Sequence, residues 1–144
     1  MPLGRKLALT SKAVGQAFNA ALVAEGGSAP IWLTLNALKQ SRWSTQLDLA
    51  RGLGIEGATL TRHLDNMEQD GYVVRVRSEA DRRAVRVELT EAGEAAYERM
   101  LRAVIAFNKR LQVGFSRDEL RDLDEMLTRL AENVESPVAA RLAG

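Results

Sequence analysis

The chain has 144 residues, of which 46% are hydrophobic and 27% are charged, and this composition is typical of one globular domain. Its formal net charge is only +1, so a surface for a polyanion could arise only from local clustering of basic residues. Cysteine is absent and His63 is the single histidine, which excludes disulfides, cysteine nucleophiles and the usual zinc sites. Because a Gly-rich phosphate loop is also missing, we expect a protein that is not an enzyme and binds no cofactor or metal.

The first predicted helix covers residues 5–24, where apolar residues recur at helical spacings until Gly26 and Gly27 end it. Pro30 then opens a second helix over IWLTLNALKQ, because proline fits the first turn of a helix. The start MPLGRKLALTSK lacks the apolar core of a signal peptide, and the interrupted run APIWLTLNAL is too short to span a bilayer. We therefore expect a soluble, cytoplasmic protein that does not bind membranes.

The stretch TQLDLARGLGIEGATLTRHLDNMEQDGYV predicts two short helices joined by a tight turn. Ser44 is expected to cap the first helix, and Gly54 permits the sharp turn at its exit. The second helix runs over about residues 57–70 and ends at Gly71, where a left-handed cap is favoured. Projection at about 100° per residue separates a polar side from an apolar side that consists of Leu60, Leu64 and Met67. The second helix is therefore a candidate recognition helix.

The polar side of this helix carries groups that can read DNA. Arg62 can form a bidentate pair with guanine, Thr59 can bond a base or a phosphate, and Ala58 can touch a thymine methyl group. Asn66 lies on the same side, and His63 lies at its boundary. The alternatives are that Arg62 and Thr59 are ordinary solvated residues and that His63 neither reads DNA nor senses pH. For Arg62 and Thr59, the tight turn that precedes the helix favours the DNA-reading interpretation.

After Gly71 the hydrophobic period changes to two, which predicts a β-hairpin from YVVRVR and AVRVEL around the loop SEADRR. The apolar residues expected to share a strand face are Val74 with Val76, and Val85 with Val87 and Leu89. Residues 72–87 contain five arginines against two acids, a local balance of +3. An arginine at the tip could enter a minor groove, with Asp81 orienting its guanidinium. The alternative is a solvated, charge-balanced turn of little energetic worth.

These patterns define an expected set of DNA-contacting residues in the two short helices and the hairpin. The set consists of Ser44, Thr45, Ala58, Thr59, Arg62, His63, Asn66, Arg75, Asp81, Arg82 and Arg83. The role of Arg82 stays open, because it either touches a phosphate or only keeps the tip soluble.

Two further helices complete the chain. Thr90 is expected to cap a long helix over residues 91–114 whose apolar residues cover so wide an arc that it needs partners on two sides. Ser116 and Glu119 form a capping box for a last helix, with an apolar stripe of Leu120, Leu123, Met126, Leu127, Leu130 and Val134. We expect a mainly α fold with a small β-hairpin (α+β). Residues 30–89 form a winged helix-turn-helix, and residues 1–29 and 90–144 form a helical platform for homodimerisation.

Residues Asp81 to Thr90, DRRAVRVELT, match the DxRxxxxxLT wing signature, and the chain therefore resembles the MarR family of bacterial regulators. The likeness continues through LDLARGLGI, TLTRHLDNMEQDGYV and LTEAG, and within the family it is greatest for the SlyA-like branch. The resemblance implies a dimeric transcriptional regulator, a repressor or an activator, that binds a pseudo-palindromic site on double-stranded DNA. By position, Arg83 resembles the family's minor-groove arginine and Asp81 the acid that orients it.

The same resemblance implies a small aromatic or phenolic effector, because many relatives respond to such compounds. Trp32 and Asn36 resemble positions that line the effector pocket, and Phe18 is expected beside them. The alternative is that Trp32 is a core residue on which Phe18 packs. A second reading of the whole chain also stays open, in which the winged helix is a protein-interaction module whose arginines bind an acidic partner without DNA.

Overall fold

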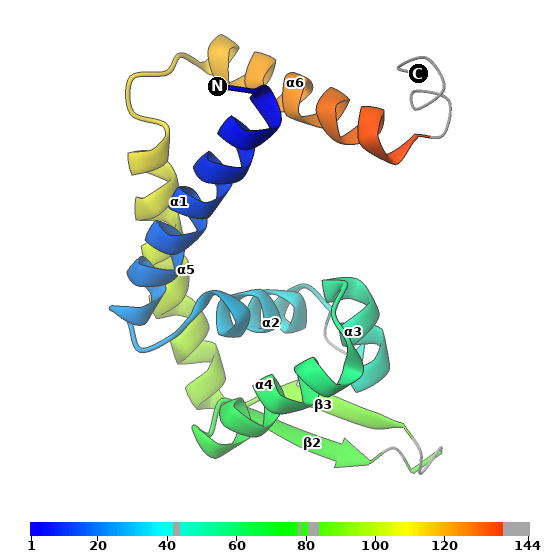
Figure 1. The fold of residues 1–144 in the computed structure, drawn as a ribbon. Helices are drawn as coiled ribbons and strands as arrows, with labels where there is room; N and C mark the ends of the chain where they lie inside the picture. The colour runs from blue at the N-terminus through cyan, green and yellow to red at the C-terminus, as the bar shows by residue number, and fades with distance from the viewer. Residues whose placement is uncertain (42–43, 78, 81–83, 137–144) are drawn as a thin grey trace. The chain divides into compact units, whose positions relative to one another are not determined.

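A computed structural model of the chain describes residues 1–41, 44–77, 79–80 and 84–136. The elements in this part of the chain are α1 (Leu3–Val23), α2 (Ala29–Gln40), β1 (Ser44–Thr45), α3 (Gln46–Leu53), α4 (Gly57–Gln69), β2 (Val73–Arg77), β3 (Val85–Leu89), α5 (Glu91–Leu111) and α6 (Arg117–Glu135) (Figure 1). The expected mainly helical fold with a small β-hairpin is confirmed. By its packing the chain divides into two compact units, Met1–Phe107 and Asn108–Gly144, and each is described by itself. Among the described helices, none combines the length and the hydropathy that crossing a bilayer requires.

The helix ends follow the local sequence signals closely. Ser28 caps α2, since its hydroxyl accepts a hydrogen bond from the Ile31 N–H at 3.3 Å, and Pro30 lies in the first turn. Gly54 ends α3 with φ of 65°, and Gly71 follows α4 with φ of 80°, both in the left-handed region that favours glycine. The cap of α3 differs from the prediction. Thr45 takes this role, with its hydroxyl accepting from the Asp48 N–H at 3.1 Å, because α3 begins at Gln46 and Thr45 is the residue directly before it.

The sheet has three antiparallel strands in the order β1-β3-β2, so the two-residue strand β1 adds to the predicted hairpin. Its inner face contains Val73 and Val87, each only 1% exposed. Val74 and Val76 share a face as predicted, but that face is the exposed one, with both side chains 43% accessible. Because strand faces alternate, burial of Val73 requires Val74 and Val76 to point outward.

One apolar core joins the winged helix-turn-helix, made by α2, α3, α4 and the hairpin, to the neighbouring ends of α1 and α5. Its fully buried members include Leu22 from α1 and Met100 from α5 together with side chains from α2, α4 and β3. Trp32 of α2 stacks on Tyr97 of α5, with ring centroids 5.4 Å apart and planes inclined by 10°. The long helix α5 is therefore anchored directly on α2, the first helix of the winged helix-turn-helix.

The second unit contains the last turn of α5 and α6. The capping box predicted for α6 is present, with reciprocal hydrogen bonds between Ser116 and Glu119. The predicted apolar stripe lies on this helix, but α6 has no buried residue, and Leu123, Met126 and Leu127 are between 44% and 53% exposed. The α6 helix is therefore amphipathic, with its apolar stripe exposed.

Candidate nucleic-acid interface

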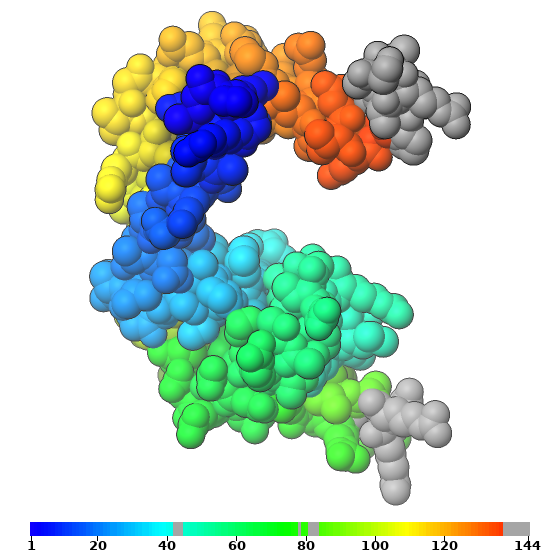
Figure 2. Space-filling view, in the orientation of Figure 1, coloured from blue at the N-terminus to red at the C-terminus, as the bar shows by residue number. Residues whose placement is uncertain are grey.

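The helix α4 lies at the surface of the winged-helix region and runs along one face of the β2–β3 hairpin (Figure 1). Leu60, Leu64 and Met67 are completely buried, which fixes the helix against the core along a single stripe, as predicted. The opposite side faces solvent, and the green segment that contains α4 is uncovered in the space-filling view (Figure 2). Burial of one stripe therefore holds the remaining side chains of α4 outward.

Five of the predicted contact residues come together on α4. Ala58, Arg62 and Asn66 are exposed, while Thr59 and His63 are half-buried at the edge of the outward side. Arg62 lies one turn after Ala58 and one turn before Asn66, so these three form a continuous solvent-facing row. This row offers a guanidinium, an amide and a small apolar contact, which are groups that hydrogen-bond or pack against base edges in a major groove.

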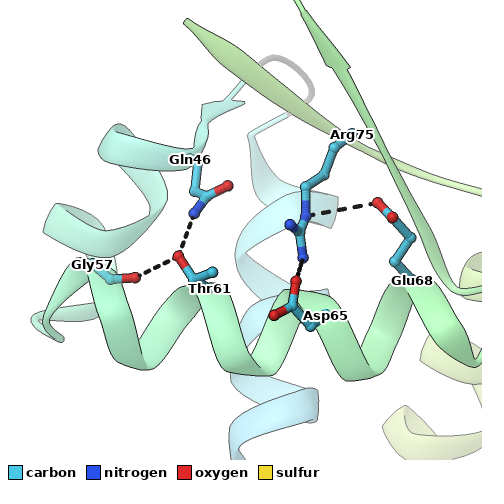
Figure 3. Close-up of polar contacts among 6 residues, drawn as sticks. All are labelled: Gln46, Gly57, Thr61, Asp65, Glu68 and Arg75. Atoms are coloured by element: carbon cyan, nitrogen blue, oxygen red, sulfur yellow. Dashed lines mark hydrogen bonds and ion pairs between the residues drawn. The ribbon is translucent and has the colours of Figure 1, made fainter. Parts of the chain in front are cut away.

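The start of α3 supplies a polar contact to α4 that the sequence did not predict. Thr61 Oγ1 accepts a hydrogen bond from Gln46 Nε2 at 2.8 Å and donates one to the carbonyl of Gly57 at 2.9 Å (Figure 3). The bond to Gly57 links the first two turns of α4. The bond from Gln46 links α4 to the start of α3. Thr45, which was expected to touch DNA, uses its hydroxyl as the cap of α3.

A second polar contact reaches α4 from the sheet. Arg75 Nη2 of β2 lies 2.5 Å from Asp65 Oδ1, and Arg75 Nε lies 3.6 Å from Glu68 Oε2 (Figure 3). Only the first distance is that of a hydrogen bond, and the second is that of an ion pair. The Arg75 side chain is 22% exposed, whereas those of Asp65 and Glu68 are 60% and 49% exposed. The guanidinium is thus held between the strand and the helix, with both acids at the outer rim.

The register of the hairpin explains why Arg75 points toward α4. Arg75 is the cross-strand partner of Val87, and Val73 is the partner of Leu89. Directly opposed residues of an antiparallel pair lie on the same face of the sheet, so Arg75 shares the inner face with the buried Val87. Arg75 was expected to touch DNA, and here its guanidinium contacts Asp65 and Glu68.

The tip of the hairpin carries the remaining predicted contacts. Asp81, Arg82 and Arg83 lie outside the described residues. On the strands themselves, Arg77 is exposed, and Arg86 Nη2 lies 3.3 Å from Glu88 Oε1 on the same strand.

Of the three residues expected at an effector site, Phe18 and Trp32 lie in two separate aromatic contacts. Trp32 is 7% exposed and stacks on Tyr97, while Phe18 packs on Phe107 with ring centroids 5.3 Å apart. Asn36 is half-buried. A pocket of about 890 Å³ is lined by parts of α3, the start of α4 and Val85, and one of about 610 Å³ by the ends of α2, β3 and α5. Neither pocket is lined by Phe18, Trp32 or Asn36.

The ionisable side chains of the described residues include one ion pair between α2 and α5 whose lysine has a shifted pKa. Within residues 1–41, 44–77, 79–80 and 84–136, no three His, Asp or Glu side chains are grouped to hold a metal ion. Lys39 Nζ lies 2.6 Å from Glu94 Oε2 and 5.6 Å from the centre of the Tyr97 ring. The hydrogen bond from Lys39 to Glu94, aided by the nearby acidic charges, raises the pKa of Lys39 above its ordinary value.

Comparison with known proteins finds a family model that matches part of the chain and solved structures that resemble most of it. Residues 28–85 match the model of the MarR family. The chain is similar to a mutant of MarR from E. coli complexed with operator DNA, at 26% identity over 90% of this chain and 94% of that chain, with a TM-score of 0.81. It is also similar to the transcriptional repressor CouR bound to a 23-mer DNA duplex, at 28% identity over 90% and 92% of the two chains, with a TM-score of 0.83.

A third structure supports the fold alone. The PcaV transcriptional regulator from Streptomyces coelicolor, in complex with its natural ligand, is 19% identical over 92% of this chain and 96% of that chain, with a TM-score of 0.78. The agreement in all three cases extends well beyond the winged helix and includes most of the flanking helices.

Proposed function

We propose that this protein, whose winged-helix segment matches the MarR family, is a DNA-binding transcriptional regulator that acts as a homodimer on a pseudo-palindromic operator. The observation that carries the proposal is the solvent-facing row of Ala58, Arg62 and Asn66 on α4, a helix fixed from behind by three fully buried side chains. In this proposal α4 enters the major groove, and its first half faces the base edges. Thr59 and His63 lie at the edge of the same contact.

The wing supplies the second part of the proposed contact. By their resemblance to the family signature, Arg83 enters an adjacent minor groove and Asp81 orients its guanidinium. Arg82 either contacts a phosphate or remains solvated, and Ser44 at the start of the neighbouring strand lies in the same proposed contact set. The sequence DRRA around the tip is also the basis for assigning the chain to the SlyA-like branch.

Dimerisation is supported by the chemistry of the terminal helices. The α6 helix has an exposed apolar stripe and contains seven acidic residues against three arginines. The α1 helix contains three basic residues and no acid, and its apolar side chains Leu3 and Leu9 are exposed. The α1 helix of one copy can therefore pack on the α6 helix of another, with apolar side chains in contact and opposite charges facing each other. Two copies would then present two α4 helices to successive major grooves, about 10 base pairs apart.

The proposal also includes repression as the regulatory outcome and a small effector molecule. CouR is a transcriptional repressor bound to DNA, and we propose repression for this chain by likeness. A small aromatic or phenolic effector would act by favouring one spacing of the two α4 helices over another. Since Trp32 is stacked on Tyr97, an effector that contacts the Trp32 ring has to displace part of this stack.

Selection of bound duplexes from a random DNA pool tests the proposed function. The selected operator and a scrambled duplex of equal length are then titrated at several salt concentrations, with the mass of the free and bound protein measured in parallel. We expect a palindromic consensus, a dimer, and an affinity that falls as salt rises because phosphate contacts release counterions. Binding to no duplex, together with retention by an acidic protein partner, would favour the interaction-module alternative.

A further inference from the structure

Arg75 connects strand β2 to α4 through two acidic side chains. Its guanidinium lies between two acids of α4, with Nη2 2.5 Å from Asp65 and Nε 3.6 Å from Glu68. Asp65 and Glu68 are three residues apart on one helix, so a single planar guanidinium can reach both. Arg77 lies two residues further along the same strand and is exposed. The two arginines thus share a strand face but differ in their surroundings.

The two acids lie close to the side of α4 that is proposed to face DNA. Asp65 lies three residues after Arg62, next to the row of side chains that faces solvent, and its side chain is 60% exposed. A duplex that meets Arg62 would bring phosphates toward Asp65, and two like charges in proximity repel one another. A cation between Asp65 and Glu68 removes much of this repulsion. The same cation joins the strand that leads into the wing to the helix that enters the major groove.

Resting on the proposed function, we propose that Arg75 is a positioning residue for DNA recognition and not a phosphate contact. Its guanidinium neutralises Asp65 and Glu68 and fixes the orientation of α4 relative to β2. Charge-assisted hydrogen bonds have strict geometry, so the Arg75–Asp65 bond limits rotation of the helix about the stripe that it buries. The inner-face register, in which Arg75 opposes the buried Val87, keeps the guanidinium directed at α4.

A cycle of substitutions separates this role from direct phosphate binding. Arg75→Gln is made in the wild-type background and in the background Asp65→Asn with Glu68→Gln, and operator affinity is measured by fluorescence anisotropy at several salt concentrations. In the wild-type background we expect a loss of about tenfold, and in the second background about twofold or less, because contacting residues couple energetically. An equal loss in the two backgrounds overturns the proposal, whatever the salt dependence.

Matched variants exclude a simple effect of net charge. Asp70→Asn removes one acid from the end of α4 without changing the Arg75 contact. In the Arg75→Gln protein it should therefore leave the operator affinity unchanged. Arg77→Gln removes one exposed cation from the same strand. It should lower the operator affinity by the same factor in both backgrounds. If Arg77 meets phosphate, its loss also lowers the salt slope by about one. If Asp70→Asn raised the affinity of the Arg75→Gln protein as much as Asp65→Asn with Glu68→Gln does, a local role for Arg75 would be contradicted.

A variant that keeps the charge provides a second test should Arg75→Gln fail to fold. Arg75→Lys retains a cation that can reach a phosphate, but an ammonium is a point charge and cannot place two separate nitrogens against Asp65 and Glu68 as the planar guanidinium does. We expect an affinity about threefold below that of the wild type, consistent with loss of part of a coupled contact. Wild-type affinity in Arg75→Lys overturns the proposal. Absence of salt-dependent binding by the wild-type protein instead overturns the proposed function itself, so the two failures are distinguishable.

Discussion

Gly93 of α5 lies so close to Tyr72 that a Cβ atom on Gly93 would be 2.0 Å from the Tyr72 carbonyl oxygen. The contact occurs where the start of the hairpin meets the start of α5. Thr90 holds the same junction, since its hydroxyl donates to the Gly71 carbonyl and accepts from the Gly93 N–H at 3.0 Å. This confirms the predicted cap of α5 and shows that the cap also binds the hairpin.

Gly93→Ala should therefore destabilise the protein. A backbone carbonyl cannot rotate away as a side chain can, so the junction must open, at a cost of about 1 to 3 kcal/mol in the free energy of unfolding. Chemical denaturation followed by circular dichroism measures the difference. Gly52→Ala is the matched control, because an added Cβ at Gly52 meets no atom within 4 Å and alanine favours the helix. Equal stability of the two variants would contradict the contact.

Trp32 is expected to contribute to stability irrespective of any effector. Its ring is 7% exposed and stacked on Tyr97, so Trp32→Ala removes a large buried surface and leaves a cavity. We predict a loss of about 3 to 5 kcal/mol in the free energy of unfolding. Leu33→Ala on the same helix is the control, since Leu33 is 52% exposed and its truncation should change stability by less than about 0.5 kcal/mol. A stable Trp32→Ala protein would favour a binding role over a core role.

The hydrogen bond between Gln46 and Thr61 predicts an energetic coupling between α3 and α4. Gln46→Met and Thr61→Val each remove one partner with little change in shape, and the double variant removes both. We expect a coupling of about 0.5 to 1.5 kcal/mol in unfolding free energy, the usual net worth of a protein hydrogen bond. Gln69→Met at the exposed end of α4, combined with Thr61→Val, should give additive effects. Additivity of Gln46→Met with Thr61→Val would mean that the bond contributes nothing.

Those features of the winged helix that depend on local sequence were predictable. The stripe of Leu60, Leu64 and Met67 follows from helical spacing alone, and the positive φ at Gly54 follows from the tight turn. The outward placement of Arg62 and Asn66 is the direct consequence of that stripe. The predicted helix over about residues 57–70 begins at the same residue as α4 and ends one residue later.

The features that depend on tertiary register were not predictable from one sequence. The alternation in YVVRVR fits either face inward, and only packing against α4 selects the face with Val73 and Arg75. The partners of Arg75 follow from that selection. Strand β1 arises from backbone pairing with β3, for which two residues carry no sequence signal. A sequence signal did exist for the polar partners on α4, because Thr61, Asp65 and Glu68 recur at helical spacing beside the buried stripe.

Lys39 and Glu94 predict a change of stability in the alkaline range. The hydrogen bond to Glu94 raises the pKa of Lys39 above the ordinary value of 10.5. A group whose pKa is raised on folding stabilises the native state fully below its unfolded pKa and loses this effect as pH rises through the folded pKa. The difference in melting temperature between the wild type and Lys39→Met should thus be constant up to about pH 10 and shrink above it. The control is Lys12→Met on α1, and a Lys39→Met difference that grows with pH would contradict the assignment.

Arg62 provides the sharpest test of base reading by α4, because it is exposed in the middle of the solvent-facing row. Arg62→Ala should weaken operator binding by about 1 to 3 kcal/mol and relax the preference at one base pair, since a bidentate contact to guanine is lost. Arg83→Ala should instead lower affinity evenly across sequences and flatten the salt dependence, as expected for an electrostatic contact. Both variants are titrated against the operator, a set of single-base-pair substitutions and a scrambled duplex. Unchanged base preference in Arg62→Ala would show that α4 does not read sequence through this residue. Comparison with Arg83→Ala ensures that a uniform loss of affinity is not mistaken for a loss of specificity.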